Sequence, residues 1–404
     1  MMQLYSNTTI HKIKRTIAIV AVSTMILSLY WGSFPQSPTY IKIIFSIGIW
    51  LAVQNFPYSL LKKNGFSKCE NYLLYSLLAL GLFQIFRSAF FPQAREVVIG
   101  NKYVSLFFNE YTSLIFIPPL FTFLGNSILS LKYLLKNTLR YIYIGLPFIL
   151  LFKLSLAPLA LYSIVFFPYV TKKNKYLIVF TIIESFLAGL TGGRMYLIVF
   201  FFSIMSYILV YVIKNSKLIY LFCFIFLVAP FLIVGSTMLF PNDGKSMFQI
   251  ISSNVEDEEM NVDTRTFLYI EIAEDLTKNE SWLLGKGAYS HYYSNYFSQN
   301  VEGGDNEDRL MCEVPFLLLL LRSGLLYVII YFCIIIIAVF KAIKSRNNFV
   351  KSLGVIMIGW YFNSFIGDIS GCRLQHLALF LLLGVCLSPM WREKNNSELL
   401  SFLK

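Results

Sequence analysis

Residues 313–340 read EVPFLLLLLRSGLLYVIIYFCIIIIAVF, and Arg322 is the only charged residue after the opening glutamate. A helix needs about 20 apolar residues to cross roughly 30 Å of hydrocarbon, so this stretch is long enough to span a membrane. Similar runs recur along the chain, whose 404 residues are 57% hydrophobic and 14% charged, against about 25% charged in soluble domains. The sequence therefore predicts an all-α polytopic membrane protein.

About twelve transmembrane helices are expected. Lysines and arginines fall in every second loop between the apolar runs, as the positive-inside rule requires. This alternation predicts cytoplasmic termini, and it accounts for the net charge of +12 without a nucleic-acid partner. The fifth and sixth runs could form one broken helix, but merging them would break the alternation downstream. The predicted spans are 16–32, 40–60, 71–91, 105–125, 139–152, 156–171, 176–192, 195–213, 218–240, 314–340, 351–367 and 374–391.

The one long polar segment divides the chain into three parts. Residues 1–240 carry nine predicted spans, residues 241–312 form a loop, and residues 313–404 carry three spans and a cytoplasmic tail. The loop holds fourteen of the 22 acidic residues and five basic ones, so the alternation places it outside the cytoplasm. Transporters often contain two related halves, and no internal repeat is visible in the sequence.

A helix is expected inside this loop at 265–276, which reads RTFLYIEIAEDL. Leu268, Ile272 and Leu276 recur at helical spacing on one face, and Glu271 falls with the other acidic residues on the opposite face. This pattern predicts an amphipathic helix that lies on the membrane surface or on the helix bundle.

Four arginines are candidates for binding an anionic substrate. Arg194 follows a Thr-Gly-Gly turn, where the backbone can approach a ligand and a guanidinium can bind two phosphate oxygens. Arg265 opens the amphipathic helix, an unfavourable place for a cation unless an anion lies there. Arg322 would lie about 13 Å along a membrane helix, where a charge costs at least ~2.5 kcal/mol. Arg309 ends the loop. Each could instead snorkel or pair with a carboxylate.

Three residues are candidates for acid–base chemistry. Glu313 stands at the entry of the helix quoted first, just outside the membrane. His291 is the loop histidine, and histidine titrates close to neutral pH, as a general base should. Asp368 lies at the mouth between the last two spans and could face the same cavity as Arg194. The structural alternative for the carboxylates, Glu110 and Glu184 included, is that they hold arginines in place.

Tyrosines follow the turn predicted at 285–287. Tyr289 and Tyr293 offer flat faces on which sugar rings can stack, although an interfacial aromatic belt would use the same residues. The six cysteines and three histidines are scattered without metal-ligand spacing, so neither a metal nor another cofactor is expected.

Four stretches of the chain resemble the O-antigen polymerase (Wzy) family. They are TGGRMYLIVF (191–200), DTRTFLYIEIA (263–273), LLGKGAYSHY (283–292) and EVPFLLLLLRSGLLYVII (313–330). The resemblance covers about residues 180–390, and the earlier helices agree with the family in hydropathy alone.

The resemblance implies a GT-C-like, metal-independent glycosyltransferase of the bacterial inner membrane with a periplasmic active site. Such an enzyme transfers a growing glycan from undecaprenyl pyrophosphate onto a new lipid-linked repeat unit. Its expected partners are these substrates, membrane lipids and a chain-length regulator. Arg194 and Arg265 match the family's arginines that would bind the donor pyrophosphate, and a carboxylate or histidine would deprotonate the acceptor hydroxyl.

Two alternatives stay open. An O-antigen ligase would pass the finished glycan to lipid A-core, and it would carry a histidine at the helix entry where Glu313 stands. A lipid-linked oligosaccharide flippase would form no bond, and it would show short external loops and two similar halves.

Overall fold

The computed structural model describes the residues that position the candidate site. These are residues 11, 14–19, 65–90, 115–125, 128–152, 156–190, 194–239, 266–294, 308–309, 312–367 and 374–403. Helices make up nearly all of the described chain both before and after the predicted loop. The early helices are α3 (Lys68–Phe90), α6 (Ile117–Leu124), α7 (Ile128–Phe152), α8 (Ala157–Ser163) and η2 (Ile164–Tyr169). The next are α9 (Lys172–Leu190), α10 (Arg194–Tyr207), η3 (Ile208–Ile213) and α11 (Ser216–Leu239).

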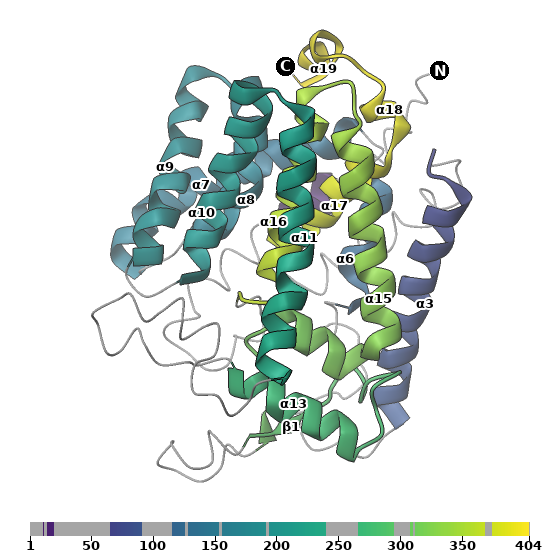
Figure 1. The fold of residues 1–404 in the computed structure, drawn as a ribbon. Coiled ribbons are helices and arrows are strands. Elements are labelled where there is room, and N and C mark those ends of the chain that lie inside the picture. Colours follow the sequence, from purple (N-terminus) through teal and green to yellow (C-terminus); the bar gives the residue numbers. More distant parts are fainter. Residues whose placement is uncertain are drawn as a thin grey trace.

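The later part of the chain begins with α13 (Thr266–Lys278) in the predicted loop. Two short antiparallel strands, β1 (Tyr292–Tyr293) and β2 (Asp308–Arg309), pair within the same region. The chain ends with α15 (Pro315–Ile343), α16 (Asn348–Asn363), α17 (Leu374–Leu387), α18 (Pro389–Arg392) and α19 (Asn396–Leu403). Figure 1 shows α3, α9, α10, α11 and α15 side by side as a bundle, with α13 lying across one end of it.

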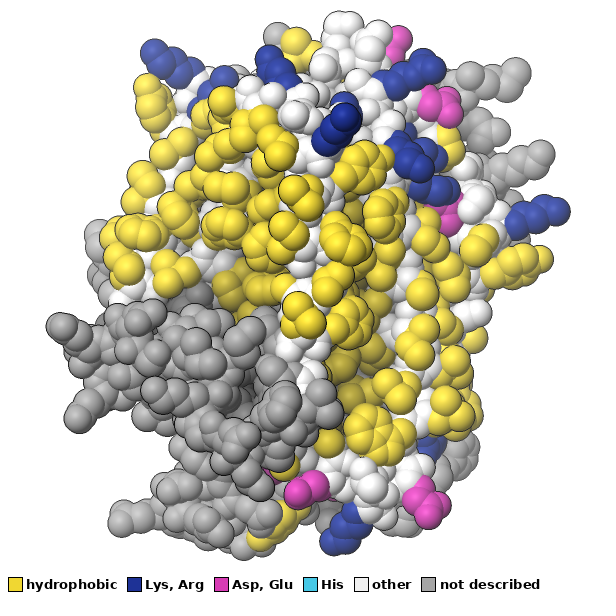
Figure 2. Space-filling model, viewed as in Figure 1, with side chains coloured by type: hydrophobic (Ala, Val, Ile, Leu, Met, Phe, Trp, Pro, Cys, Tyr) yellow, Lys and Arg dark blue, Asp and Glu magenta, His cyan; other side chains and the backbone are white. Residues whose placement is uncertain are grey.

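Among the described residues, three helices are long and apolar enough to cross a membrane: Lys68–Ser88, Met195–Ile213 and Pro315–Ile343. Shorter apolar helices cover Leu159–Tyr169, Ser216–Leu232 and Gln375–Leu387. Apolar side chains form a broad belt around the described face of the bundle (Figure 2), as lipid contact requires. These features support an all-α membrane protein. The predicted span 40–60 lies outside the described residues, as do most of 16–32 and about half of 105–125.

Basic side chains gather at the end of the bundle opposite α13 (Figure 2). The antiparallel succession of α9, α10 and α11 brings the lysines in the first turn of α9 and those at the junction of η3 and α11 to this end. The succession of α15 and α16 brings the basic residues at 341–351 there as well. The cation-rich loops therefore share one end, which we call the basic end.

Helix α7 differs from the prediction. The sequence suggested a loop through Lys132, Lys136 and Arg140 and a helix from residue 139, but α7 begins at Ile128 and includes all three cations. Long basic side chains are good helix formers and can keep their charged groups in water while their stems cover apolar surface. Phe152 ends α7, and Ala157 begins α8, so the fifth and sixth predicted spans are separate helices.

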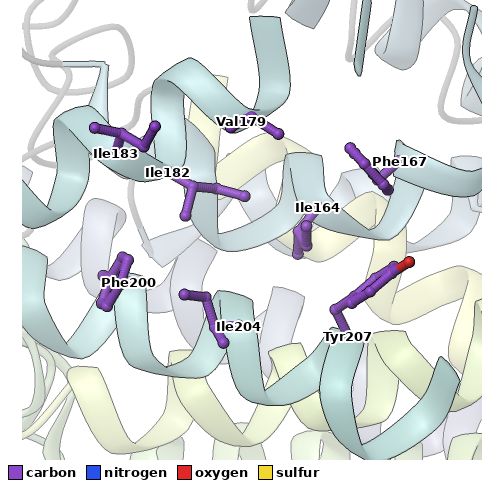
Figure 3. A pocket seen from close by; sticks show the side chains of 8 residues that line it. All are labelled: Ile164, Phe167, Val179, Ile182, Ile183, Phe200, Ile204 and Tyr207. Carbon is purple, nitrogen blue, oxygen red and sulfur yellow. The ribbon is translucent and has the colours of Figure 1, made fainter. Parts of the chain in front are cut away.

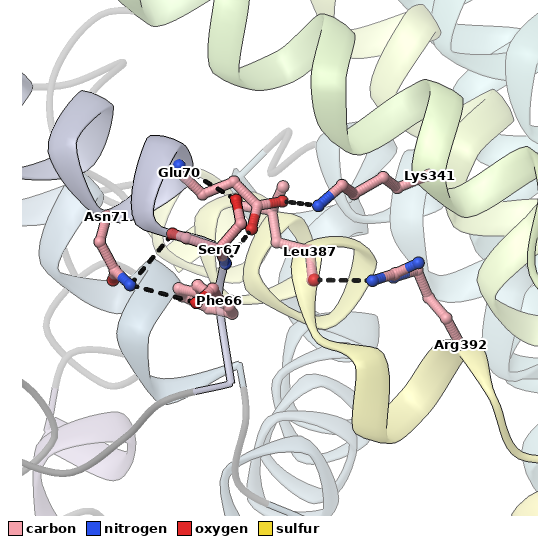
Figure 4. A network of polar contacts seen from close by, with 7 residues as sticks. All are labelled: Phe66, Ser67, Glu70, Asn71, Lys341, Leu387 and Arg392. Atoms are coloured by element: carbon pink, nitrogen blue, oxygen red, sulfur yellow. Dashed lines mark hydrogen bonds and ion pairs between the residues drawn. The ribbon is translucent and has the colours of Figure 1, made fainter.

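An ion pair joins α3 to α15 near the basic end (Figure 4). Lys341 Nζ contacts Glu70 Oε1, while the other carboxylate oxygen, Oε2, accepts a hydrogen bond of 2.6 Å from the Ser67 amide. The Ser67 hydroxyl in turn accepts from the Glu70 amide at 3.3 Å, which completes a capping box at the start of α3. Glu70 is 3% exposed, so its charge is stabilised by these contacts.

We expect Glu70→Gln to lower the stability of the detergent-solubilised protein by about 1–2 kcal/mol, because the amide keeps the cap but loses the charge facing Lys341. Thermal unfolding followed by tryptophan fluorescence would show a lower midpoint. In the Lys341→Met background the same change should cost less, because the two residues act as a pair. Equal costs in both backgrounds would contradict a coupled pair.

Candidate functional site

The candidate site lies at the end of the bundle opposite the basic end, where helix α13 packs across the other helices (Figure 1). Leu268, Ile272 and Leu276 are almost fully buried, which confirms the predicted apolar face. This face packs on α15 and α11, so the helix rests on the bundle. The Tyr269 hydroxyl donates a 2.7 Å hydrogen bond to the Phe365 carbonyl, which fastens α13 to the end of α16.

Glu271 is the exception to the predicted pattern of α13. Its expected place was the solvent face, but it is only 8% exposed. It lies three residues after Leu268 and beside Ile272, so it belongs to the edge of the buried stripe. The spacing of Glu271 from Leu268 in the sequence already indicated this position at the edge of the buried face. A carboxylate therefore faces the protein interior at the centre of this helix.

Helix α15 is broken at Gly324, where φ is 73° and ψ is 177°. The prediction of one continuous helix through residues 314–340 is therefore wrong at this point. In an unbroken helix the Leu325 and Leu326 amides would donate to the carbonyls of Leu321 and Arg322. Here the two amides donate instead to Trp282 and Leu283 carbonyls, at 2.8 and 3.2 Å.

The turn at residues 282–287 completes the hydrogen bonding of this break. The Leu321 carbonyl accepts from the Lys286 amide at 2.7 Å, and the Arg322 carbonyl accepts from the Gly287 amide at 3.1 Å. The turn thus pairs the two amides and two carbonyls that lose their helical partners at the break, as an apolar interior requires. We call residues 282–287 the inserted turn.

Glycines make the inserted turn possible. Gly285 and Gly287 have φ values of 67° and 106°, as the predicted turn requires. A Cβ on Gly285 would lie 2.6 Å from backbone atoms of Arg322 and Gly324. A Cβ on Gly324 would collide with the Gly285 amide and the Leu283 carbonyl. The two backbones touch at a place where only glycine fits.

The end of α3 holds the inserted turn from the other side. Arg87 donates to the carbonyls of Leu284 and Gly285 at 3.2 and 2.7 Å, and Gln84 also donates to the Leu284 carbonyl. Arg87 was not among the predicted site residues. In the sequence it reads as the last charged residue of a membrane helix, and nothing nearby reveals a partner about 200 residues away.

Lys286 ties the inserted turn to both α13 and the tyrosine-rich segment. Its Nζ lies 2.7 Å from Asp275 Oδ2 and donates a 2.7 Å hydrogen bond to the His291 carbonyl. Asp275 and Lys286 are both largely buried side chains. These contacts fix the path of the chain from the turn into β1, where the charged residues of the site converge.

The charged residues meet around Cys312 and Tyr292, just before α15 begins. In the strand register Tyr292 lies opposite Arg309. Burial raises the Cys312 pKa to about 12; the Glu313 charge adds to this rise, and the charges of Arg309 and Arg322 oppose it. Burial also raises the pKa of Tyr292. The charges of Glu271 and Glu313 add to this rise, and the charge of Arg309 opposes it. Two arginines and two carboxylates therefore lie within electrostatic reach of one buried thiol and phenol.

No family model, curated protein or solved structure matches this chain. The site is therefore interpreted from its own geometry.

Three predicted residues, Arg309, Glu313 and Arg322, lie within electrostatic reach of Cys312. Arg309 and Glu313 are half-buried, whereas Arg322 is completely buried. Because the inserted turn pairs with the backbone on both sides of it, Arg322 lies level with that turn instead of deep within an unbroken membrane helix. Its guanidinium is enclosed by protein, and its positive charge contributes to the electrostatic potential around Cys312.

The other predicted residues are distributed more widely. Tyr289 is 4% exposed, and its amide donates to the Ser88 hydroxyl at 3.3 Å, so its ring is part of the core; Tyr293 is 45% exposed. His291 is half-buried next to β1. Arg194 begins α10 as expected, while its side chain, Arg265 and Asp368 lie outside the described residues.

An apolar pocket lies away from these charges, between η2, α9 and α10 (Figure 3). It measures about 300 Å³ and is lined by Ile164, Phe167, Val179, Ile182, Ile183, Phe200, Ile204 and Tyr207. Its side chains point toward one another across the gap and offer almost no polar group. The pocket suits a hydrocarbon chain and has nothing with which to bind a sugar or a phosphate.

Within the described part of the chain, no cluster of three or more histidine, cysteine, aspartate or glutamate residues could hold a metal ion.

Proposed function

We propose that this protein is a polysaccharide polymerase of the O-antigen type. It would transfer a growing glycan from undecaprenyl pyrophosphate onto a lipid-linked repeat unit. The observation that carries the proposal is that Arg309 and Glu313, just before α15, lie within electrostatic reach of the same buried thiol, Cys312, as does the enclosed Arg322. There, a half-buried cation suited to a pyrophosphate lies near a carboxylate suited to a proton, at the edge of an apolar belt.

The proposed reaction is a direct displacement. The acceptor hydroxyl oxygen forms a bond to the anomeric carbon of the donor glycan, and the bond from that carbon to the pyrophosphate oxygen breaks. The hydroxyl proton passes to the Glu313 carboxylate, and undecaprenyl pyrophosphate leaves with the bonding electrons. Arg309, with Arg194 and Arg265, would neutralise the charge that develops on the pyrophosphate, as fixed cations do in other transfer reactions.

Several residues support this division of roles. Arg322 is enclosed, so it would raise the local positive potential and hold the α15 entry in place without touching the donor. The exposed ring of Tyr293 would stack on a sugar, with Tyr289 supporting it from the core. His291 is the second candidate base, and Asp368 a third. The periplasmic location of this end follows from the positive-inside rule, because the basic end lies opposite.

A ligase or a flippase would make different demands on the same end. A ligase of this group would carry a histidine at the α15 entry, and Glu313 stands there. A flippase would need no proton acceptor beside a cation cluster. Both are outcomes of the experiment that follows.

The test is a silver-stained lipopolysaccharide gel from a strain with this gene deleted, with plasmid complementation as the control. A polymerase predicts core plus a single repeat unit, because ligation and flipping continue. Core alone with polymer on the lipid carrier would identify a ligase, and core alone with single units on the cytoplasmic face would identify a flippase. Either of the latter two results would overturn the proposal.

A further inference from the structure

A second pocket lies near the basic end, between α7 and α9. Its volume is about 300 Å³, and it is lined by Lys136, Leu139, Arg140, Tyr143, Ile144, Asn174 and Leu177. We call it the basic pocket. It belongs to the opposite end of the bundle from Glu313, so the proposed transfer reaction makes no use of it.

Cations dominate this pocket. Lys136 and Arg140 are one helical turn apart on α7, so their side chains cover the same face. Lys173 Nζ lies 5.5 Å from the ring centre of Tyr143, which adds a third cation at the rim. The sequence of α7 contains no acidic residue. Among the described residues, no carboxylate forms an ion pair with any of the three cations.

The start of α9 adds positive potential to the same place. The first turn of a helix has amides without helical partners and carries partial positive charge, so acidic residues are favoured there. The first turn of α9 reads KKNK instead and contains no acid. Asn174 lies within this turn and lines the pocket, where its side-chain amide can donate a hydrogen bond. An anion in the pocket would relieve the repulsion among these groups.

The remaining wall of the pocket is apolar and continuous with the lipid-facing belt. Tyr143 and Ile144 are 56% and 47% exposed, and Leu139 and Leu177 complete the wall. A free phosphate ion would gain nothing from such a wall. An anionic phospholipid has a phosphate for the cations and acyl chains for the apolar side chains, and a basic pocket between membrane helices at headgroup level suits it.

We propose that the basic pocket binds the headgroup of an anionic phospholipid, with an acyl chain lying along α7 and α9. The phosphate contacts Lys136 and Arg140, and Asn174 donates to it. The site is separate from the proposed transfer chemistry, so its test needs no catalytic activity.

The test is native mass spectrometry of the purified full-length protein in detergent, titrated with phosphatidylglycerol or phosphatidylcholine. We expect wild type to retain phosphatidylglycerol in preference to phosphatidylcholine. Lys136→Gln/Arg140→Gln should weaken phosphatidylglycerol binding about tenfold or more, because each cation near a lipid surface contributes substantially. The matched control is Lys214→Gln/Lys217→Gln, which removes two exposed cations, one just after η3 and one in the first turn of α11.

Equal losses in the two double variants would show general surface attraction and overturn the site. Equal binding of the two lipids by wild type would do the same, as would complete displacement of phosphatidylglycerol by millimolar inorganic phosphate. Size-exclusion profiles check that each variant is folded. If the double variant is not, Lys136→Gln and Arg140→Gln are tested singly, and each should weaken binding more than Lys217→Gln does.

Discussion

Gly324→Ala is expected to prevent the protein from accumulating in a folded form. The φ and ψ of this residue are accessible to glycine almost alone, and an added methyl group would meet the backbone of the inserted turn. Strain and collision together should cost about 4 kcal/mol or more, a large share of the roughly 5–15 kcal/mol that stabilises a typical protein. Fluorescence-detected size-exclusion chromatography would show loss of the monodisperse peak.

The matched control is Gly235→Ala in α11. This glycine has open space where a Cβ would be placed, and alanine is the better helix former. Its peak and melting temperature should equal or exceed those of wild type. A monodisperse Gly324→Ala protein with an unchanged melting temperature would show that the inserted turn does not hold α15 as described.

Glu313→Gln is expected to lower polymer formation by about 10²–10⁴-fold, because a side-chain amide cannot take up the proton of the acceptor sugar's hydroxyl group. The protein should still accumulate, since Glu313 is half-buried and lies outside the first turn of α15. The measurement is the chain-length ladder produced in the deletion strain that carries the variant, normalised to the amount of protein in the membrane.

Two further variants sharpen this prediction. Glu274→Gln removes an exposed carboxylate from α13 at the same end of the molecule and should leave the ladder unchanged. Glu313→Asp keeps a carboxylate on a shorter side chain and should restore part of the activity. A full ladder from Glu313→Gln would assign the proton to another group, with His291 the next candidate.

The sequence was sufficient for those parts of the site that local patterns determine. The spacing of Leu268, Ile272 and Leu276 predicted α13 and its buried face. Pro315 marked the start of α15, since proline is well tolerated in the first helical turn. The glycines at 285 and 287 indicated a turn. In each case the physical cause lies within a few residues of its effect.

The parts that escaped prediction depend on contacts between distant segments. The break at Gly324 is stable only because the inserted turn supplies amides and carbonyls from about forty residues earlier. Arg87 and Gln84 hold that turn from a helix about 200 residues away in sequence. Nothing in the local pattern around residues 320–330 shows such partners, so the stretch reads as an ordinary membrane helix and Arg322 as a deeply inserted charge.

The inserted turn also limits how such proteins can be recombined. Four hydrogen bonds join it to the broken ends of α15, and the end of α3 holds it in place. A chimaera that exchanged residues 266–294 alone would place a foreign turn at the break in α15, where it would form the same four hydrogen bonds only if its backbone had the same shape. Functional grafts of residues 266–294 should therefore carry the α3 terminus and the first half of α15 as one unit.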